Sequence, residues 1–92
     1  MGIDGLYGEI CELVARIQEE RCATPQFTMV IKDGPLATVA LSIPDVKKEY
    51  RKSGNTNLEF ENMDPSLLVS IRAVRDFLKG HIRRVEEARV NG

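Results

Sequence analysis

The chain has 92 residues, of which 42% are hydrophobic, 29% are charged and 5% are aromatic, and its formal net charge is −1. This length suits one domain, so we treat residues 1–92 as a single domain, and the charge balance argues neither for nor against an anionic partner. No stretch approaches the roughly 18 apolar residues of a membrane-spanning helix, and the N-terminus carries no basic-then-apolar leader. We therefore expect a soluble, cytoplasmic protein without a membrane partner.

The first predicted element is an amphipathic helix near the N-terminus. Its apolar residues recur at helical spacing: Ile3, Leu6, Ile10, Leu13 and Ile17. Asp4 can cap this helix, which we expect to be firm from about Glu9 to Arg21 and to end at Thr24-Pro25.

Two strands follow, because the apolar period changes from helical to two. The pattern predicts one strand over residues 26–32 and a second over 36–43. Asp33-Gly34 is a hairpin turn signal, but Pro35 lacks the N–H that a two-residue turn would use. We therefore expect a longer loop with Gly34 at positive φ.

The next segment is less regular. Residues 45–56 fit either a short helix or a charged loop, and we favour a short extra helix over 44–53. That helix would place Val46 and Tyr50 on one face, with Gly54 just beyond its end. A third strand is predicted over 57–61, with Leu58 and Phe60 facing inward.

The last predicted element is a long helix. Asp64 at the N-cap and Pro65 at the first helical position mark its start, and it runs to about Arg89, with Gly80 able to interrupt it. Its apolar stripe consists of Leu67, Ile71, Val74, Leu78, Ile82 and Val85.

Together these elements predict an α+β fold, in which two helices cover one face of a three-stranded antiparallel sheet in the order helix, three strands, helix. The last helix, about 37 Å long, exceeds a five-residue strand of about 17 Å. Its end around Ile82, Val85 and Val90 therefore needs cover from a second copy or from a partner.

Residues able to carry catalysis or bind a metal are few. Cys11 and Cys22 would lie about 16 Å apart on one helix, which is too far for a disulfide and favours a reducing compartment. The only histidine, His81, has neither a catalytic partner nor a metal-binding pattern beside it. We therefore predict no catalytic residue, no metal, no cofactor and no small-molecule substrate.

Two groups of cations stand out. The basic cluster consists of Lys47, Lys48, Arg51 and Lys52. The basic stripe consists of Arg72, Arg75, Lys79 and Arg83, which fall within about 80° of one another on a helix. Such stripes can track phosphates or can border a packed helix seam as an interface rim.

The same element order occurs in double-stranded-RNA-binding domains. The run TPQFT at 24–28, followed by Gly34-Pro35, is similar to their first strand and turn. Those domains place lysines at the start of the last helix, where this chain has DPSL at 64–67. The acidic residue at that point argues against RNA binding in their mode.

A second resemblance is to the YbaB/EbfC-type nucleoid-associated proteins, which are small dimers with this element order. The run DPSLL at 64–68 and the run RRVEE at 83–87 look like their final segment. Those proteins have a shorter sheet region and no equivalent of the basic stretch at 47–52. We assign the chain to neither family.

These observations favour a small non-enzymatic protein-interaction module that is homodimeric and acts by binding another macromolecule, as an adaptor, a regulator or a phage- or mobile-element-type inhibitor. Ile82 and Val85 would anchor the interface, and its rim would be Arg75, Lys79 and Arg83. The alternative is a nucleic-acid-binding protein that uses the basic cluster and the basic stripe. A third hypothesis is an enzyme subunit whose site forms only in the oligomer.

Overall fold

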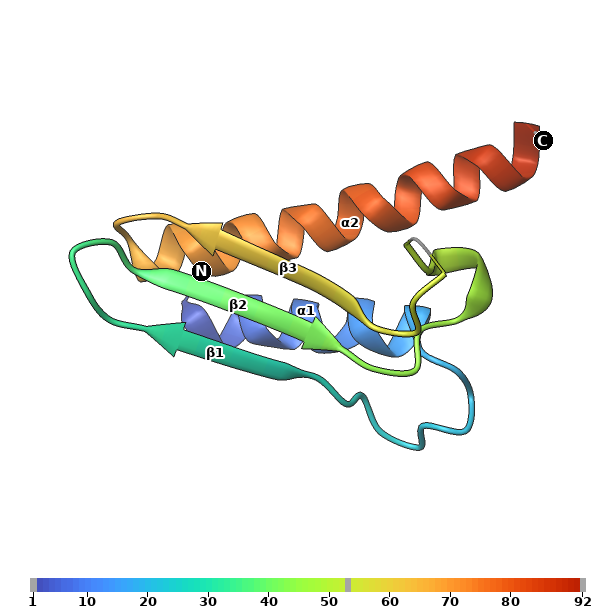
Figure 1. Cartoon of the computed structure of the whole chain (residues 1–92), viewed down its shortest axis with the longest axis horizontal. Helices are drawn as coiled ribbons and strands as arrows, with labels where there is room; N and C mark the ends of the chain where they lie inside the picture. The colour runs from blue at the N-terminus through green and yellow to red at the C-terminus, as the bar shows by residue number, and fades with distance from the viewer. Residues whose placement is uncertain (1, 53, 92) are drawn as a thin grey trace.

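A computed structural model describes residues 2–52 and 54–91 of the protein. In chain order its elements are α1 (Ile3–Ile17), β1 (Thr28–Lys32), β2 (Thr38–Ile43), the 3-10 helix η1 (Lys48–Tyr50), β3 (Leu58–Met63) and α2 (Leu67–Asn91). The strands form one antiparallel sheet in the order β1-β2-β3, and both helices lie behind it in Figure 1. The structure therefore confirms the predicted α+β fold.

The central strand β2 organises the sheet. Leu41 lies opposite Met29 of β1 and Phe60 of β3 in the register of the three strands. Because side chains alternate between the faces of a sheet, the buried residues Val39, Leu41 and Ile43 all point toward the helices. The opposite face carries Thr28, Val30, Lys32, Thr38, Ala40, Ser42, Glu59, Glu61 and Met63.

The core lies between this sheet and the two helices, and it is almost entirely aliphatic. Its buried members are Leu6, Ile10, Val14, Ile17, Val39, Leu41, Ile43, Val46, Tyr50, Leu58, Ile71, Val74, Leu78 and Ile82. The helical members follow the predicted spacing, because only residues three or four positions apart share one face of a helix.

The helices α1 and α2 run side by side in the same direction (Figure 1). Glu9, in the first half of α1, accepts a 3.0 Å ion pair from Arg75 of α2. Arg16, at the end of α1, pairs with Glu86 farther along α2. These contacts join the N-terminal and C-terminal segments of one chain.

The bounds of α1 differ from the prediction. Its N-cap is Gly2 rather than Asp4, and no side chain caps it. The helix ends at Ile17, before the predicted end at Arg21, so Cys22 lies outside it.

Gln18 explains why α1 stops early. Its backbone is extended and forms an isolated bridge with Val46. Its buried side-chain amide donates to the carbonyls of Gln26 (2.5 Å) and Pro44 (2.8 Å), and its Oε1 accepts from the Gln26 amide (2.9 Å). Beside it, two backbone groups that a longer α1 would use internally bond to another segment: the amide of Glu19 donates to Asp45 (3.1 Å), and the carbonyl of Ile17 accepts from Lys47 (2.8 Å).

The strand prediction was right in number and pairing but wrong at the ends. β1 and β2 begin two residues later than expected, at Thr28 and Thr38, and β3 extends to Met63. The expectation of a positive φ at Gly34 was wrong. Among residues 2–52 and 54–91, positive φ occurs at Asp45 (53°) and Gly54 (75°).

The short helix predicted over 44–53 is present only in part, and residue 53 lies outside the described residues. The segment contains the single 3-10 turn η1. Val46 donates its amide to the carbonyl of Thr56 (3.0 Å), and Lys47 donates to that of Ile17 (2.8 Å), so these groups are taken by neighbouring segments instead of a helix. Val46 and Tyr50 are nevertheless buried together.

α2 begins two residues later than predicted. Ser66 is its N-cap, because its carbonyl accepts from the amide of Ser70 (2.8 Å) and its Oγ accepts from that of Val69 (3.5 Å). Asp64 lies before the helix: its Oδ1 accepts from the amide of Ser66 (3.3 Å), and its own amide extends the sheet by donating to Ala37 (2.9 Å). The helix continues through Gly80 without a break.

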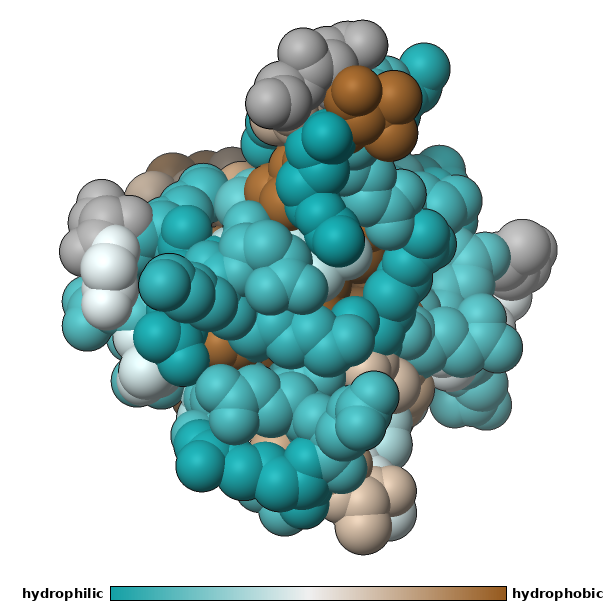
Figure 2. Space-filling model, turned by 90° about the vertical axis from the view of Figure 1, so that its right-hand side faces the viewer, coloured by the Kyte–Doolittle hydropathy of each residue, from teal (hydrophilic) through white to brown (hydrophobic). Residues whose placement is uncertain are grey.

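The predicted overhang of α2 is largely covered by the chain itself. Ile82 is only 3% exposed, and His81 Nε2 hydrogen bonds to the carbonyl of Tyr50 in η1 (2.8 Å). Val85 packs against the core, whereas Val90 is 86% exposed. Figure 2 looks at this end of the molecule and shows a mostly hydrophilic surface with hydrophobic atoms near the projecting end of α2.

Candidate interaction surfaces

The basic cluster is only partly available to a ligand. Arg51 is turned inward, where its Nε donates to the carbonyl of Val46 (2.9 Å) and its Nη2 pairs with Glu19 (3.2 Å). The ammonium of Lys52 lies 4.5 Å from the centre of the Phe77 ring, in a cation–π contact. Two of the four cations therefore contribute to the fold.

A second ion pair ties the same segment to the loop after α1. Arg21 donates a 2.6 Å hydrogen bond to Asp45 and pairs with Glu19 at 3.1 Å. The hydrogen bond with Asp45 and the charge of Glu19 raise the pKa of Arg21 above its ordinary value. This network fixes the loop against the positive-φ turn at Asp45.

The basic stripe is interrupted by acidic partners. Arg75 has a side chain only 16% exposed, and it pairs with Glu9 and with Asp76. The hydrogen bond with Glu9 in particular raises the pKa of Arg75, although partial burial opposes the shift. Arg83 pairs with Glu87 at 3.2 Å, so the stripe presents less positive charge than its sequence suggests.

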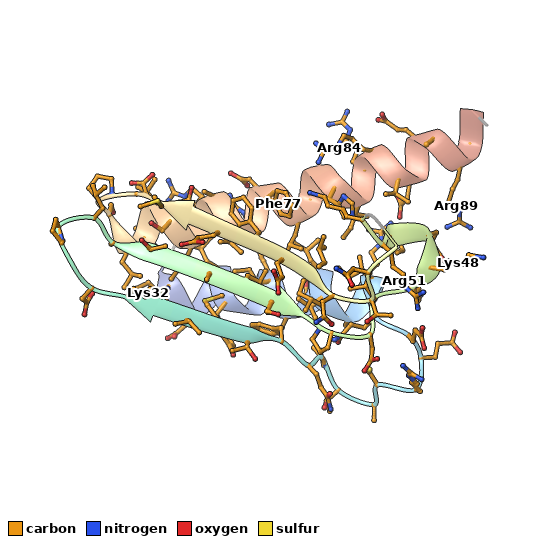
Figure 3. The ribbon with its side chains drawn as sticks, in the orientation of Figure 1. Lys32, Lys48, Arg51, Phe77, Arg84 and Arg89 are labelled. Atoms are coloured by element: carbon orange, nitrogen blue, oxygen red, sulfur yellow. The ribbon has the colours of Figure 1, made fainter. Side chains whose placement is uncertain are left out.

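The remaining cations do not form one surface. Figure 3 shows Lys48 and Arg89 at the η1 end of the molecule, while Arg84 points away from the sheet on the opposite side of α2. Lys32 lies at the far end of β1 in the same view. A nucleic-acid backbone would have to bend around the molecule to reach all of them.

A groove between α1 and α2 brings together part of the predicted interface. It has a volume of about 400 Å³ and is lined by Leu13, Arg16, Lys79, Ile82, Arg83 and Glu86. Three of these, Lys79, Ile82 and Arg83, were expected at an interface. The other two expected residues, Arg75 and Val85, lie outside the lining.

Sequence reasoning missed the contribution of α1 to this groove. Leu13 is half-buried and supplies most of the apolar floor, because Ile82 is almost fully covered. Arg16 supplies a third cation, although it pairs with Glu86. The spacing of Leu13 and Arg16 beside the buried stripe of α1 was the available signal, but only the parallel packing of the helices shows that they face α2.

A second surface, the outer edge of β1, was not predicted. Val30 and Ile31 point to opposite faces of the sheet, yet they are 44% and 46% exposed. On α1, Tyr7 is 48% exposed, and its ring lies 5.5 Å from that of Phe27, the residue just before β1. The sequence signal was the run of consecutive apolar residues in β1, where a strand with one wet face would alternate.

The described residues show little that resembles a catalytic centre. His81 is 6% exposed, and its Nε2 is engaged by the backbone of η1. Within 2–52 and 54–91, no three His, Cys, Asp or Glu side chains gather as metal ligands would. Neither helix in this part of the chain has the length and apolar character needed to cross a bilayer.

No protein-family model, no curated protein and no solved structure matches this chain significantly. The two resemblances seen in the sequence therefore rest on short residue runs and element order.

Proposed function

We propose that the protein is a non-enzymatic protein-interaction module that holds an acidic segment of a partner protein in the groove between α1 and α2. One observation carries this proposal: the groove combines an apolar floor with a rim in which the cations Arg16, Lys79 and Arg83 outnumber the single carboxylate, Glu86. Interfaces commonly have this arrangement of an apolar centre and a polar rim.

The chemistry of the rim favours carboxylates on the partner. In the free chain Arg16 and Arg83 pair with Glu86 and Glu87, and these pairs are solvent-exposed and therefore weak. Lys79 has no ion pair among the residues that the structure describes. Partner carboxylates could engage all three cations while one apolar side chain covers Leu13, which would give specificity and sensitivity to salt.

The alternative function, nucleic-acid binding, has weaker support. It uses the basic cluster and the basic stripe, and in these groups Arg51 and Arg75 are engaged by carboxylates of the same chain. Affinity for nucleic acid comes mainly from cations that are free to contact phosphates. Lys47, Lys48 and Arg72 remain the best test positions for this alternative.

The proposal is tested by affinity capture with matched charge reversals. The full chain, the double variant K79E/R83E and the control R72E, which reverses an exposed α2 cation outside the groove, are immobilised and exposed to cell extract. We expect a protein retained by the wild type and by R72E but lost with K79E/R83E. With the purified partner, binding should weaken at least about 10-fold in the double variant, because like charges then face each other.

Capture that is equal for all three baits would contradict the proposal. Recovery of nucleic acid that is lost at high salt and lost in R72E would instead support the alternative function.

A further inference from the structure

The outer edge of β1 exposes free backbone hydrogen-bonding groups, and their positions can be deduced. The amide of Asp64 donates to the directly opposite carbonyl of Ala37, which fixes the phase of the β2–β3 ladder. Hydrogen-bonded pairs alternate along antiparallel strands. Thr38, Ala40 and Ser42 of β2 therefore bond toward β1, where they face Lys32, Val30 and Thr28.

It follows that Met29 and Ile31 direct their N–H and C=O groups away from β2. Natural sheets protect such an edge with proline, inward-facing charge or a covering segment. β1 contains no proline, its one charge is Lys32 at the end of the strand, and β1 is an outermost strand of the sheet. Val30 and Ile31 leave apolar surface exposed on both sides of this edge.

We propose that β1 pairs antiparallel with β1 of a second copy, centred on Val30, and joins two three-stranded sheets into one six-stranded sheet. In this register Met29 faces Ile31 of the second copy, and these are the residues with free backbone groups. Val30 faces Val30 of the second copy as a non-hydrogen-bonded pair, and Thr28 faces Lys32 of the second copy. No like charges meet, so the strand is complementary to itself.

The other exposed edge, β3, is a poorer surface for self-association. Glu59 and Glu61 share its outer face. Pairing β3 with itself about Phe60 would place each glutamate opposite the other, and like charges directly opposite are destabilising. Pairing β1 with β3 of another copy would leave edges open and would build a chain of molecules instead of a closed dimer.

Exposed apolar side chains of α1 beside β1 also favour a second copy of the chain as the binding partner of this edge. Tyr7 lies against Phe27 beside β1, and Ile3 lies one turn earlier and is 44% exposed. A two-fold axis through Val30 places the helices of both copies on one face of the joined sheet. The apolar surfaces of the two α1 helices then flank the junction symmetrically.

The register is tested by disulfide trapping. In a background with Cys11 and Cys22 changed to serine, Val30→Cys is oxidised mildly and examined by non-reducing electrophoresis. We expect a covalent dimer, because non-hydrogen-bonded pairs have Cα atoms about 4.5 Å apart, within disulfide range. The matched control Thr28→Cys should form no covalent dimer, since the two introduced thiols lie about 13 Å apart along the strands.

The association itself is tested by sedimentation of the wild type and of Val30→Lys. The wild type should be a dimer, and the dimer of the variant should dissociate at least about 10-fold more readily, because two ammonium groups then face each other. A wild type that is monomeric at every concentration would overturn the proposal, as would equal cross-linking of the two cysteine variants. If Val30→Lys fails to fold by circular dichroism, the cysteine comparison decides alone.

Discussion

Gln18 shows how one polar residue can determine the length of a helix. It is 2% exposed, and its amide satisfies three backbone groups, two on Gln26 and one on Pro44. Buried polar groups without partners are costly, so a residue with these hydrogen bonds gains more from leaving the helix than from extending it.

The first prediction concerns this residue. Gln18→Ala should lower the free energy of unfolding by about 2–4 kcal/mol, because it strands buried backbone groups of two segments. Urea denaturation followed by circular dichroism gives the value. The control Gln26→Ala should change stability by less than about 0.5 kcal/mol, because the structure uses only the backbone of Gln26. Similar losses in both variants would show that the Gln18 amide is not structural.

At the scale of elements, η1 holds the segment between β2 and β3 against α2, and the sequence could not predict its conformation. Its buried side chain Tyr50 belongs to the core together with Val46, which lies two residues before η1, and the carbonyl of Tyr50 is held to α2 through His81. The ring of His81 also lies parallel to that of Phe77, with centroids 6.2 Å apart. The position of η1 therefore depends on contacts made by one residue of α2, a helix that is distant in sequence.

The second prediction is that His81→Leu loosens η1 without disturbing the sheet. The carbonyl of Tyr50 loses its hydrogen-bond partner, which should lower the free energy of local unfolding of η1 by about 1–2 kcal/mol. Hydrogen exchange should accelerate in residues 46–52 and stay unchanged in β2. Tyr50→Phe is the control, because its hydroxyl makes only a 3.5 Å contact with Glu86. Uniform acceleration across both elements would contradict a local role for His81.

Periodicity predicted which elements exist, and it could not predict where they end. Each of α1, α2 and β2 buries one face. The apolar spacing that marks this face is set by residues close together in sequence, so it can be recognised from the sequence alone. The ends depend on distant partners: Gln18 meets Pro44, and Asp64 meets Ala37. The ion pairs of Arg51 with Glu19 and of Arg75 with Glu9 could not be predicted for the same reason, because the partners are far apart in sequence.

At the scale of the whole molecule, α2 divides into a part inside the core and a part that projects. The sequence suggested that Ile82 belongs to the projecting part and anchors a partner. In the fold it is a core residue, because η1 and α1 cover this turn of α2. Val90, which is exposed to solvent, belongs to the projecting part.

The third prediction separates these parts. Ile82→Asp should destabilise the protein by at least about 4 kcal/mol, because it buries an unpaired carboxylate. Such a loss removes most of the stability of a small domain. Val90→Asp should change the free energy of unfolding by less than about 0.5 kcal/mol, since its site is already in water. Thermal unfolding of both variants measures the difference, and a stably folded Ile82→Asp variant would place this turn of α2 at the surface.

The parallel pairing of α1 with α2 also constrains the order of events as the chain leaves the ribosome. β1 and β2 are joined by the short connection 33–37, and β2 and β3 by the longer segment 44–57, so the three strands can pair before α2 is synthesised. α1 is synthesised first, but the helix that packs along it is synthesised last. Its buried stripe of Leu6, Ile10, Val14 and Ile17 shares a core with the sheet, but its packing against α2 must wait for closure of the loop between the two helices. Until α2 emerges, α1 lacks its helical partner, so chaperone contact and aggregation risk concentrate on the apolar face of this helix.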